Sequence, residues 1–450
     1  MATRKMFDED DTGDYTGGDG GQMASSSGQG QNEGHTHQEE EYKGTVDFDK
    51  VPLQEKSFIP TIYDDENYEF KVVKPQLHGS HIVYNVQGVD KQGPFEGVRR
   101  YNHFYCLYEA LQKRWPGVLI PKLPSKKAIG NKEVKFIYER KFYLERFLRK
   151  CARFEFIVNS EEFRIFARPG SGDLEKMLDR LPRIPTGTMI ERFREVTGVN
   201  ERNYDFADKE RLNQVVAEFT IFAKKVLIQM KAMKKSLSSF RDVRMQSIAN
   251  NRVLLNLLDK YEDLNINCYT DNNADKLVLN NTEQKQLKEQ MEHMVENQKN
   301  SFDQMYHWCK GEIYDIKAVM NSINQKDAFE KNLKKTESKK ANTEADLDNV
   351  NAGKKTMRTM FKDEKDSTKL QTTIEVTAKE LDNLEVLISL ITIYLGENII
   401  PQFKKDKLKI YHKLMQQFTV IEINNAHQTA SFWSNVLSNP QVKNAPTAKA

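Results

Sequence analysis

The longest regular pattern of apolar positions in this chain lies in its C-terminal half. Apolar residues recur there at steps of three and four, from Leu212 through Phe219 and Val226 to Leu264. This spacing predicts one amphipathic helix of about 55 residues, roughly 80 Å long at a rise of ~1.5 Å per residue. The Asn-rich stretch 265–273 ends the pattern.

Two further long helices are predicted after this break. The second runs from about Lys276 into the 340s, and the third runs from about Lys369 to Leu437, with a bend at Gly396 or Pro401. Three long helices joined by two short breaks predict an elongated antiparallel coiled coil. Its apolar stripe is wider than the seam of a two-stranded coiled coil, so we expect self-dimerisation to bury the remainder.

A compact α+β domain is predicted ahead of these helices. Short runs of alternating and β-branched residues, followed by helical spacing, indicate a three-stranded antiparallel meander and two helices. The predicted strands are 68–73, 81–89 and 95–101, and the predicted helices are 103–115 and 133–151, joined by a proline-bearing loop.

Composition narrows the classes of function. Charged residues make up 30% of the chain and hydrophobic residues 38%, a balance that suits long exposed helices better than one large core. The net charge of +3 does not indicate a nucleic-acid-binding protein. No uninterrupted apolar run approaches the ~18 residues of a membrane span. Residues 1–45 hold ten acidic and three basic residues in Gly- and Ser-rich sequence, which predicts a disordered tail.

The cysteines give no sign of a disulfide framework or a metal site. They stand far apart and form no CxxC pair, so we expect free thiols in a reducing cytosol. The adjacent His307, Trp308 and Cys309 point in different directions on a helix, which favours packing over metal ligation. We assign no metal and no cofactor. The four cysteines are Cys106, Cys151, Cys268 and Cys309.

Three cationic positions and one aromatic ring carry the candidate chemistry. Arg-Arg-Tyr-Asn-His-Phe occupies 99–104 at the end of the third strand, Ile-Pro-Lys-Leu-Pro-Ser-Lys occupies 120–126, and Arg140 lies in the next helix. An arginine fork can bind a phosphate bidentately, and a lysine supplies a point charge for a second phosphate. An aromatic face can lie under a sugar-like ring.

In order and spacing, these motifs resemble the phox-homology (PX) domain over roughly residues 62–168. The resemblance implies a site for phosphatidylinositol 3-phosphate, and it implies that Arg99 braces the fold. It assigns the 3-phosphate to Arg100, the face beneath the inositol ring to Tyr101, the 1-phosphate to Lys126, and the 4- and 5-hydroxyls to Arg140. Ile120 departs from the proline that is usual at the start of the loop motif.

A PX-like domain followed by three long helices resembles the PX–BAR sorting nexins. The segments 393–404 and 432–433 look like parts of the last BAR helix of these proteins. The resemblance implies an α+β PX domain and an all-α, three-helix BAR coiled coil. The implied divisions are an N-terminal region at 1–57, a PX domain at 58–170, an amphipathic linker helix at 171–204, a BAR domain at 205–437 and a tail at 438–450.

The linker helix is the first candidate for direct membrane contact. Met189, Ile190 and Phe193 share one face of this helix, opposite Glu191 and Glu195. Family analogy favours membrane contact by that face. A strut that packs the PX domain onto the coil is the alternative, and the pattern leaves it open.

The predicted turn between the second and third long helices is the second candidate. Nine basic residues stand against four acidic ones from Lys331 to Lys362. Basic side chains near an anionic leaflet each add about 1 kcal/mol of binding. Lys354, Lys355 and Arg358 are the chosen contacts, and an ordinary solvated face is the alternative. The next candidates are Lys404, Lys405, Lys407 and Lys409.

Three classes of function can combine a PX-like domain with long helices. The first is a peripheral endosomal sorting nexin, cytoplasmic, that binds phosphatidylinositol 3-phosphate and senses or generates curvature as a homodimer or as a heterodimer with another sorting nexin. Retromer or another cargo-sorting complex is its expected partner. The second is a dimeric scaffold that tethers partners to the endosomal membrane without remodelling it. The third, an enzyme with an accessory PX domain, is rejected because no catalytic motif or further globular region follows.

Overall fold

The structure is a computed structural model, and it places part of the chain in two separate units. It describes residues 69–79, 81–126, 134–170, 172–281, 286–353 and 364–445. The units divide between residues 189 and 190, within helix α7. The predicted N-terminal tail lies outside the described residues.

The first unit contains the predicted antiparallel meander. Its strands are β1 (Lys71–His78), β2 (His81–Asp90) and β3 (Gly93–Arg100), in the order β1-β2-β3. β1 extends beyond the predicted run because a bulge between Val73 and Gln76 lets pairing with β2 resume. Lys74 takes a positive φ of 48° at this bulge.

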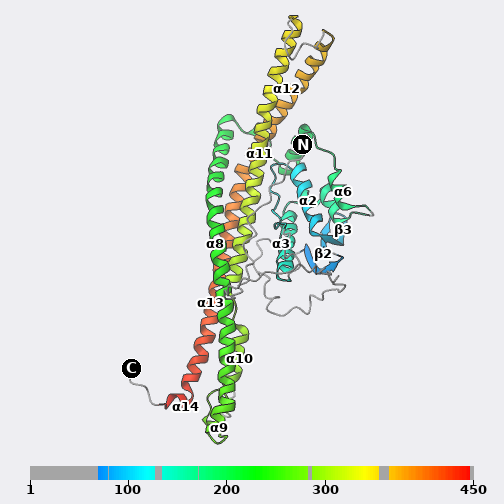
Figure 1. Ribbon diagram of the computed structural model, residues 1–450. Coiled ribbons are helices and arrows are strands. Elements are labelled where there is room, and N and C mark those ends of the chain that lie inside the picture. Colours follow the sequence, from blue (N-terminus) through cyan, green and yellow to red (C-terminus); the bar gives the residue numbers. More distant parts are fainter. Residues whose placement is uncertain are drawn as a thin grey trace, which may run out of the picture. The chain divides into compact units, whose positions relative to one another are not determined.

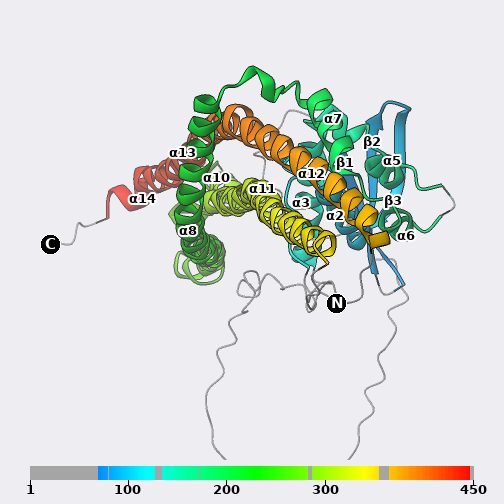
Figure 2. The same cartoon turned by 90° about the horizontal axis from the view of Figure 1, so that it is seen from above.

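Helices surround this sheet in the first unit (Figures 1 and 2), and aromatic rings fill its core. α3 packs against β1, and α2 and α5 pack against β3. The Phe163 ring meets Phe70 edge-on at 5.8 Å and Phe95 at 6.5 Å, and all three are buried. The helices are α2 (Tyr101–Arg114), α3 (Val134–Ala152), α4 (Glu155–Val158), α5 (Glu161–Ala167) and α6 (Leu174–Asp179).

Long helices dominate the second unit, as the apolar periodicity predicted. The longest, α8, has 56 residues and starts where the Asp205 carboxylate accepts a hydrogen bond from the Asp208 N–H. α11 and α12 run side by side in both views, with α8 packed on α11 (Figures 1 and 2). The elements are the part of α7 (Thr186–Thr197) from Ile190 on, η3 (Glu201–Asn203), α8 (Phe206–Tyr261), η4 (Glu262–Ile266), α9 (Asn267–Tyr269), η5 (Ala274–Lys276), α10 (Gln286–Asn297), α11 (Ser301–Asn351), α12 (Glu364–Ile393), η7 (Tyr394–Ile399), α13 (Ile400–Ser438) and α14 (Pro440–Lys443).

The second long helix is interrupted, which the sequence pattern did not predict. Instead of one helix from about residue 276, a short η5 turn is followed by α10 and then α11, with a break at 298–300. Asn300 explains the break, because its side chain accepts from the Phe302 N–H and donates to the Arg241 carbonyl. A side-chain amide that caps one helix and also binds the backbone of a neighbouring helix stabilises the start of a new helix at this point, in place of one continuous helix.

The third long helix bends through π-helical turns and does not break. η7 carries Gly396, one of the two predicted bend positions. A Cβ atom at Gly396 would lie 2.8 Å from Leu212 Cδ2 on α8, so the glycine permits close approach of the two helices. Pro401 falls in the first turn of α13, directly after η7.

Ion pairs are buried inside the helical unit. The Lys407 ammonium donates to the Glu312 carboxylate at 2.7 Å and to the Asp315 carboxylate. All three side chains are at most 17% exposed. Lys407 was a candidate for membrane contact, and these contacts contradict that expectation because its charge is satisfied between α11 and α13.

One helix of the described chain, Ser367–Ser438, contains an 18-residue stretch apolar enough on average to cross a membrane. Of that stretch, 61% is buried. The core helix of a helical bundle has the same character, so the stretch does not by itself indicate a membrane span.

Apolar side chains remain exposed along α8. Most of them continue the stripe whose width predicted a further partner, and the other described helices leave them uncovered. The exposed residues of this stripe are Phe222, Met233, Phe240, Val253, Leu254, Leu257, Leu258 and Tyr261 on α8 and Leu264 on η4; Ile221, Ile228 and Val243 are exposed outside it.

Candidate functional site

Arg99 and Arg100 are the last two residues of β3, and their side chains lie in different environments. Arg99 is 6% exposed, and its guanidinium donates to the carbonyls of Phe166 at 2.7 Å and Ala167 at 2.9 Å. Burial lowers the pKa of Arg99 to about 10. These contacts tie β3 to the last turn of α5, so the predicted bracing role of Arg99 is confirmed.

Arg100 immediately precedes α2 and directs its guanidinium toward α6. Arg100 Nε lies 2.9 Å and Nη2 lies 2.5 Å from the same oxygen, Oε1 of Glu175. The His103 Nε2 atom lies 3.7 Å from that oxygen. The Arg100 side chain is 38% exposed, so it reaches solvent while it holds an anion.

The acid in this contact keeps its charge. Burial raises the pKa of Glu175, but hydrogen bonds from Asn102 and Arg100 outweigh burial and place that pKa below its ordinary value. Burial, aided by the charge of Arg100, lowers the pKa of His103. Glu175 is therefore a carboxylate near neutral pH, and Arg100 is the cation that balances it.

Tyr101 and Arg140 form a second group of contacts beside Arg100. The Arg140 guanidinium lies 4.5 Å from the ring centre of Tyr101 and 4.2 Å from that of Phe136. The Tyr101 hydroxyl donates to the Pro124 carbonyl at 2.5 Å. Both Tyr101 and Arg140 are less than a tenth exposed. The structure thus brings Tyr101, Arg140 and the proline-bearing loop together.

Lys126 follows this loop two residues after Pro124, and its side chain is exposed. The next described residue is 134, where α3 begins. Of the four predicted headgroup residues, Arg100 and Lys126 reach solvent, whereas Tyr101 and Arg140 pack against each other. Sequence reasoning missed His103 and Glu175 as partners of Arg100, and Asn102 as a second donor to Glu175.

The apolar face of the linker helix, which was a candidate for membrane contact, is largely buried. Ile190 is 5% and Phe193 is 3% exposed, and the Phe193 ring meets the Tyr394 ring of η7 edge-on at 5.4 Å. Met189 is half-buried. These contacts bury Ile190 and Phe193 within the helical unit, and membrane contact by this face stays a prediction.

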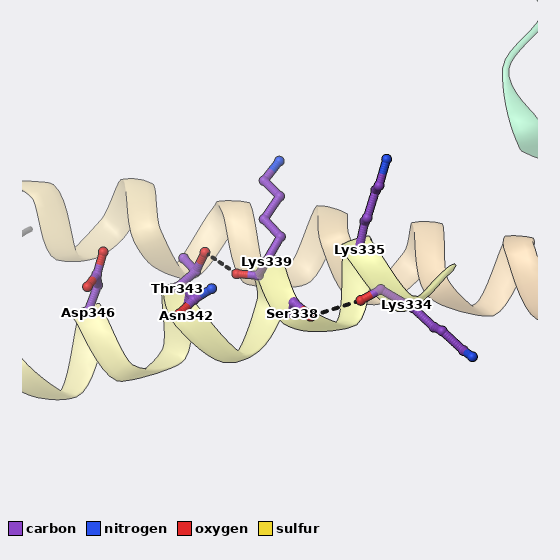
Figure 3. Close-up of a pocket in the computed structure, with 7 residues that line it drawn as sticks. All are labelled: Lys334, Lys335, Ser338, Lys339, Asn342, Thr343 and Asp346. Atoms are coloured by element: carbon purple, nitrogen blue, oxygen red, sulfur yellow. Dashed lines mark hydrogen bonds between the residues drawn. The ribbon is translucent and has the colours of Figure 1, made fainter. Parts of the chain in front are cut away.

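The basic stretch of α11 lines an open groove (Figure 3). Lys335 and Lys339 point to one side of the helix there, and Lys334 points to the other. The hydroxyls of Ser338 and Thr343 donate hydrogen bonds to backbone carbonyls of the same helix. The predicted contacts Lys354, Lys355 and Arg358 lie outside the described residues.

Comparison with known proteins supports both units. The family model of the PX domain matches residues 87–169, a segment that includes all four predicted headgroup residues. The chain is 32% identical over 97 residues to vacuolar protein sorting-associated protein vps5 of Schizosaccharomyces pombe, covering 20% of this chain and 17% of that protein. It is 32% identical over 97 residues to mouse sorting nexin-18, covering 22% and 16%.

The matched segment spans no more than about a sixth of these relatives, so the likeness concerns the PX domain. A PX domain-containing protein kinase-like protein of the rat is equally similar, at 32% over 96 residues, with 21% of this chain and 16% of that protein covered. A solved structure extends the likeness in fold. The SNX-BAR Mvp1 tetramer contains a chain that aligns with a TM-score of 0.56 and 14% identity, over 82% of this chain and all of that one.

Together, the sheet, the matched segment and the long helices define the class: a PX domain joined to a long-helical unit. The chain has the fold of the PX–BAR sorting nexins, as the sequence resemblance predicted.

Proposed function

We propose that this chain is a peripheral membrane protein of endosomal sorting that binds phosphatidylinositol 3-phosphate through its PX domain. The observation that carries the proposal is Arg100, which lies inside the matched PX segment and holds a carboxylate with two N–H groups while 38% exposed. A guanidinium placed to hold one anion near solvent can hold a phosphomonoester in the same way.

The other headgroup roles follow the PX resemblance. Lys126 supplies the charge for the 1-phosphate from an exposed position. Tyr101 and Arg140 contribute as a packed pair, in which the guanidinium orients the ring that lies beneath the inositol. We propose that Arg140 reaches the 4- and 5-hydroxyls from this position. The chain performs no catalysis in this proposal.

The long-helical unit would act as a dimer on curved membrane. The exposed apolar stripe of α8 is the surface that a second copy, or another sorting nexin, would cover. Two PX pockets on one dimer would raise the apparent affinity about 10²–10⁴-fold when both reach one membrane. Retromer-type retrograde transport is the proposed route, with a cargo-sorting complex as partner.

Flotation with liposomes tests the headgroup site. Vesicles that contain phosphatidylinositol 3-phosphate should retain the parent chain and release Arg100→Ala, because the phosphate loses its charged donors. Arg180→Ala, which removes an equal charge from an exposed position in the same unit, is the control and should bind as the parent does. Equal loss in both variants, or none in either, would contradict the proposed site.

A dimeric scaffold that does not remodel membrane is the second candidate, favoured by the burial of Ile190 and Phe193. Electron microscopy of the same liposomes separates the two candidates. Coated tubules support remodelling, and undeformed vesicles that carry bound protein support the scaffold.

Light scattering tests the dimer. The chain has a mass of 52.3 kDa, and we expect about twice that at micromolar concentration. A mass near that of one chain would contradict the dimer.

Charge reversal at Lys354, Lys355 and Arg358 tests the proposed basic contacts. It should weaken binding to small vesicles, more so at low salt, and leave binding of a soluble headgroup unchanged. The same dependence on vesicle diameter and salt in variant and parent would mean that these residues form an ordinary solvated face.

A further inference from the structure

Several donors from the end of β3 and the start of α2 converge on the carboxylate of Glu175. Arg100 gives two N–H groups, Asn102 gives a side-chain hydrogen bond, and the His103 ring lies 3.7 Å away. The start of a helix also favours an anion, because its first N–H groups are unpaired in the helix. The chain has therefore built an anion site, and one of its own carboxylates fills it.

Glu175 comes from outside the segment that the PX family model matches, which ends at residue 169. Its helix, α6, packs on α2, and Leu174 and Leu178 of this helix are buried. Asp173 caps this helix by accepting from the N–H groups of Glu175 and Lys176. The carboxylate is thus held against Arg100 by an anchored turn.

The pairing leaves Arg100 incompletely used. Both contacts fall on one oxygen, Oε1 of Glu175, so the geometry is not the two-oxygen fork that makes arginine–anion pairs strong. Arg100 Nη1 has no hydrogen-bond partner among the described residues. A phosphomonoester offers three oxygens and a larger charge, so it can engage donors that the carboxylate does not.

We propose that Glu175 is a resident competitor for the phosphate site, an internal carboxylate that occupies Arg100 in the lipid-free chain and is displaced when a phosphoinositide headgroup binds. This inference rests on the proposed function and adds its regulation: α6 sets the affinity of the PX domain. Any event that moves α6 off α2 frees Arg100 and strengthens binding.

The size of the effect follows from population arithmetic. The apparent dissociation constant is the intrinsic one divided by the fraction of chains in which Arg100 is available. A half-exposed ion pair of this kind leaves Arg100 available in about a half to a fifth of the chains. Removal of the charge of Glu175 should therefore tighten headgroup binding about two- to fivefold. A purely structural ion pair between α6 and α2 predicts unchanged or weaker binding instead.

The test is titration of the full chain with soluble short-chain phosphatidylinositol 3-phosphate, followed by calorimetry. Glu175→Gln removes the charge and keeps an amide oxygen that Arg100 can still contact, so the fold is preserved. Asp179→Asn is the matched control, because it removes one negative charge from an exposed position on the same helix. Arg100→Ala and the double variant Arg100→Ala/Glu175→Gln complete the set.

We expect Glu175→Gln to bind about two- to fivefold tighter than the parent, Asp179→Asn to match the parent, and the double variant to bind no better than Arg100→Ala. If Glu175→Gln binds the headgroup and the parent does not, the inference is also supported, and the Arg100–Glu175 contact is then stronger than assumed. If the parent binds through Arg100 and Glu175→Gln gains nothing, or gains no more than Asp179→Asn, the competitor is overturned and the proposed function stands. If no variant binds the headgroup, both are overturned.

Discussion

The two adjacent arginines offer a sharp test, because one substitution should damage folding and the other should damage binding. Arg99→Ala leaves the carbonyls of Phe166 and Ala167 without the donors that now satisfy them inside the first unit. An unsatisfied buried polar group costs about 1–3 kcal/mol, so two such carbonyls lower the free energy of unfolding by at least about 2 kcal/mol. For a domain of this size, that is a fall of roughly 10 °C or more in melting temperature.

Arg100→Ala should behave in the opposite way. Its pair with Glu175 is 38% and 24% exposed on the two sides, and such pairs contribute at most about 1 kcal/mol. We expect the melting temperature of this variant to stay within a few degrees of the parent's, while binding to phosphatidylinositol 3-phosphate is lost. Arg99→Ala should still bind the headgroup below its own melting transition.

Differential scanning calorimetry of the full chain measures the first effect, and titration with soluble headgroup measures the second. Arg99→Lys is an informative intermediate, because one ammonium keeps the charge but lacks the planar fork that reaches both carbonyls. Its melting temperature should lie between those of the parent and Arg99→Ala. Equal melting temperatures for Arg99→Ala and the parent would refute the reasoning, as would an equally large fall for Arg100→Ala.

Three further predictions concern stability. Lys407→Ala leaves two buried carboxylates without their cation and should lower the free energy of unfolding of the helical unit in urea by about 3–5 kcal/mol. An unchanged midpoint would show those charges to be solvated. Gly396→Ala forces a methyl group against Leu212 and should cost about 1–3 kcal/mol, and a neutral result would mean that the two helices separate freely. The hydrogen bond from Arg168 holds the pKa of Asp90 below its ordinary 3.8. The stability that this ion pair contributes is therefore complete above pH 3.8 and is lost as the pH falls through the lower pKa of the folded state. In a series of melting temperatures against pH, Asp90→Asn should lack this loss at acid pH, and identical profiles for variant and parent would contradict the prediction.

Local pattern was enough to predict much of this architecture. The three- and four-residue steps of α8 and the alternation of β2 depend on neighbours close in sequence, because helix and strand periodicity decide which side chains share a face. The same holds for the order of the PX motifs, since Arg100, Tyr101 and Lys126 lie within 27 consecutive residues. Even the bend at Gly396 had a local signal.

The tertiary structure decided which of these groups meet. Arg100 and Glu175 are 75 positions apart, and Lys407 and Glu312 are 95 apart, so no periodicity connects them. The sequence pattern around a charged residue is the same whether its side chain contacts solvent, a membrane or a buried partner. Only packing, which removes water and fixes distances, selects among these, and it made Lys407 a core ion pair and Glu175 the partner of Arg100.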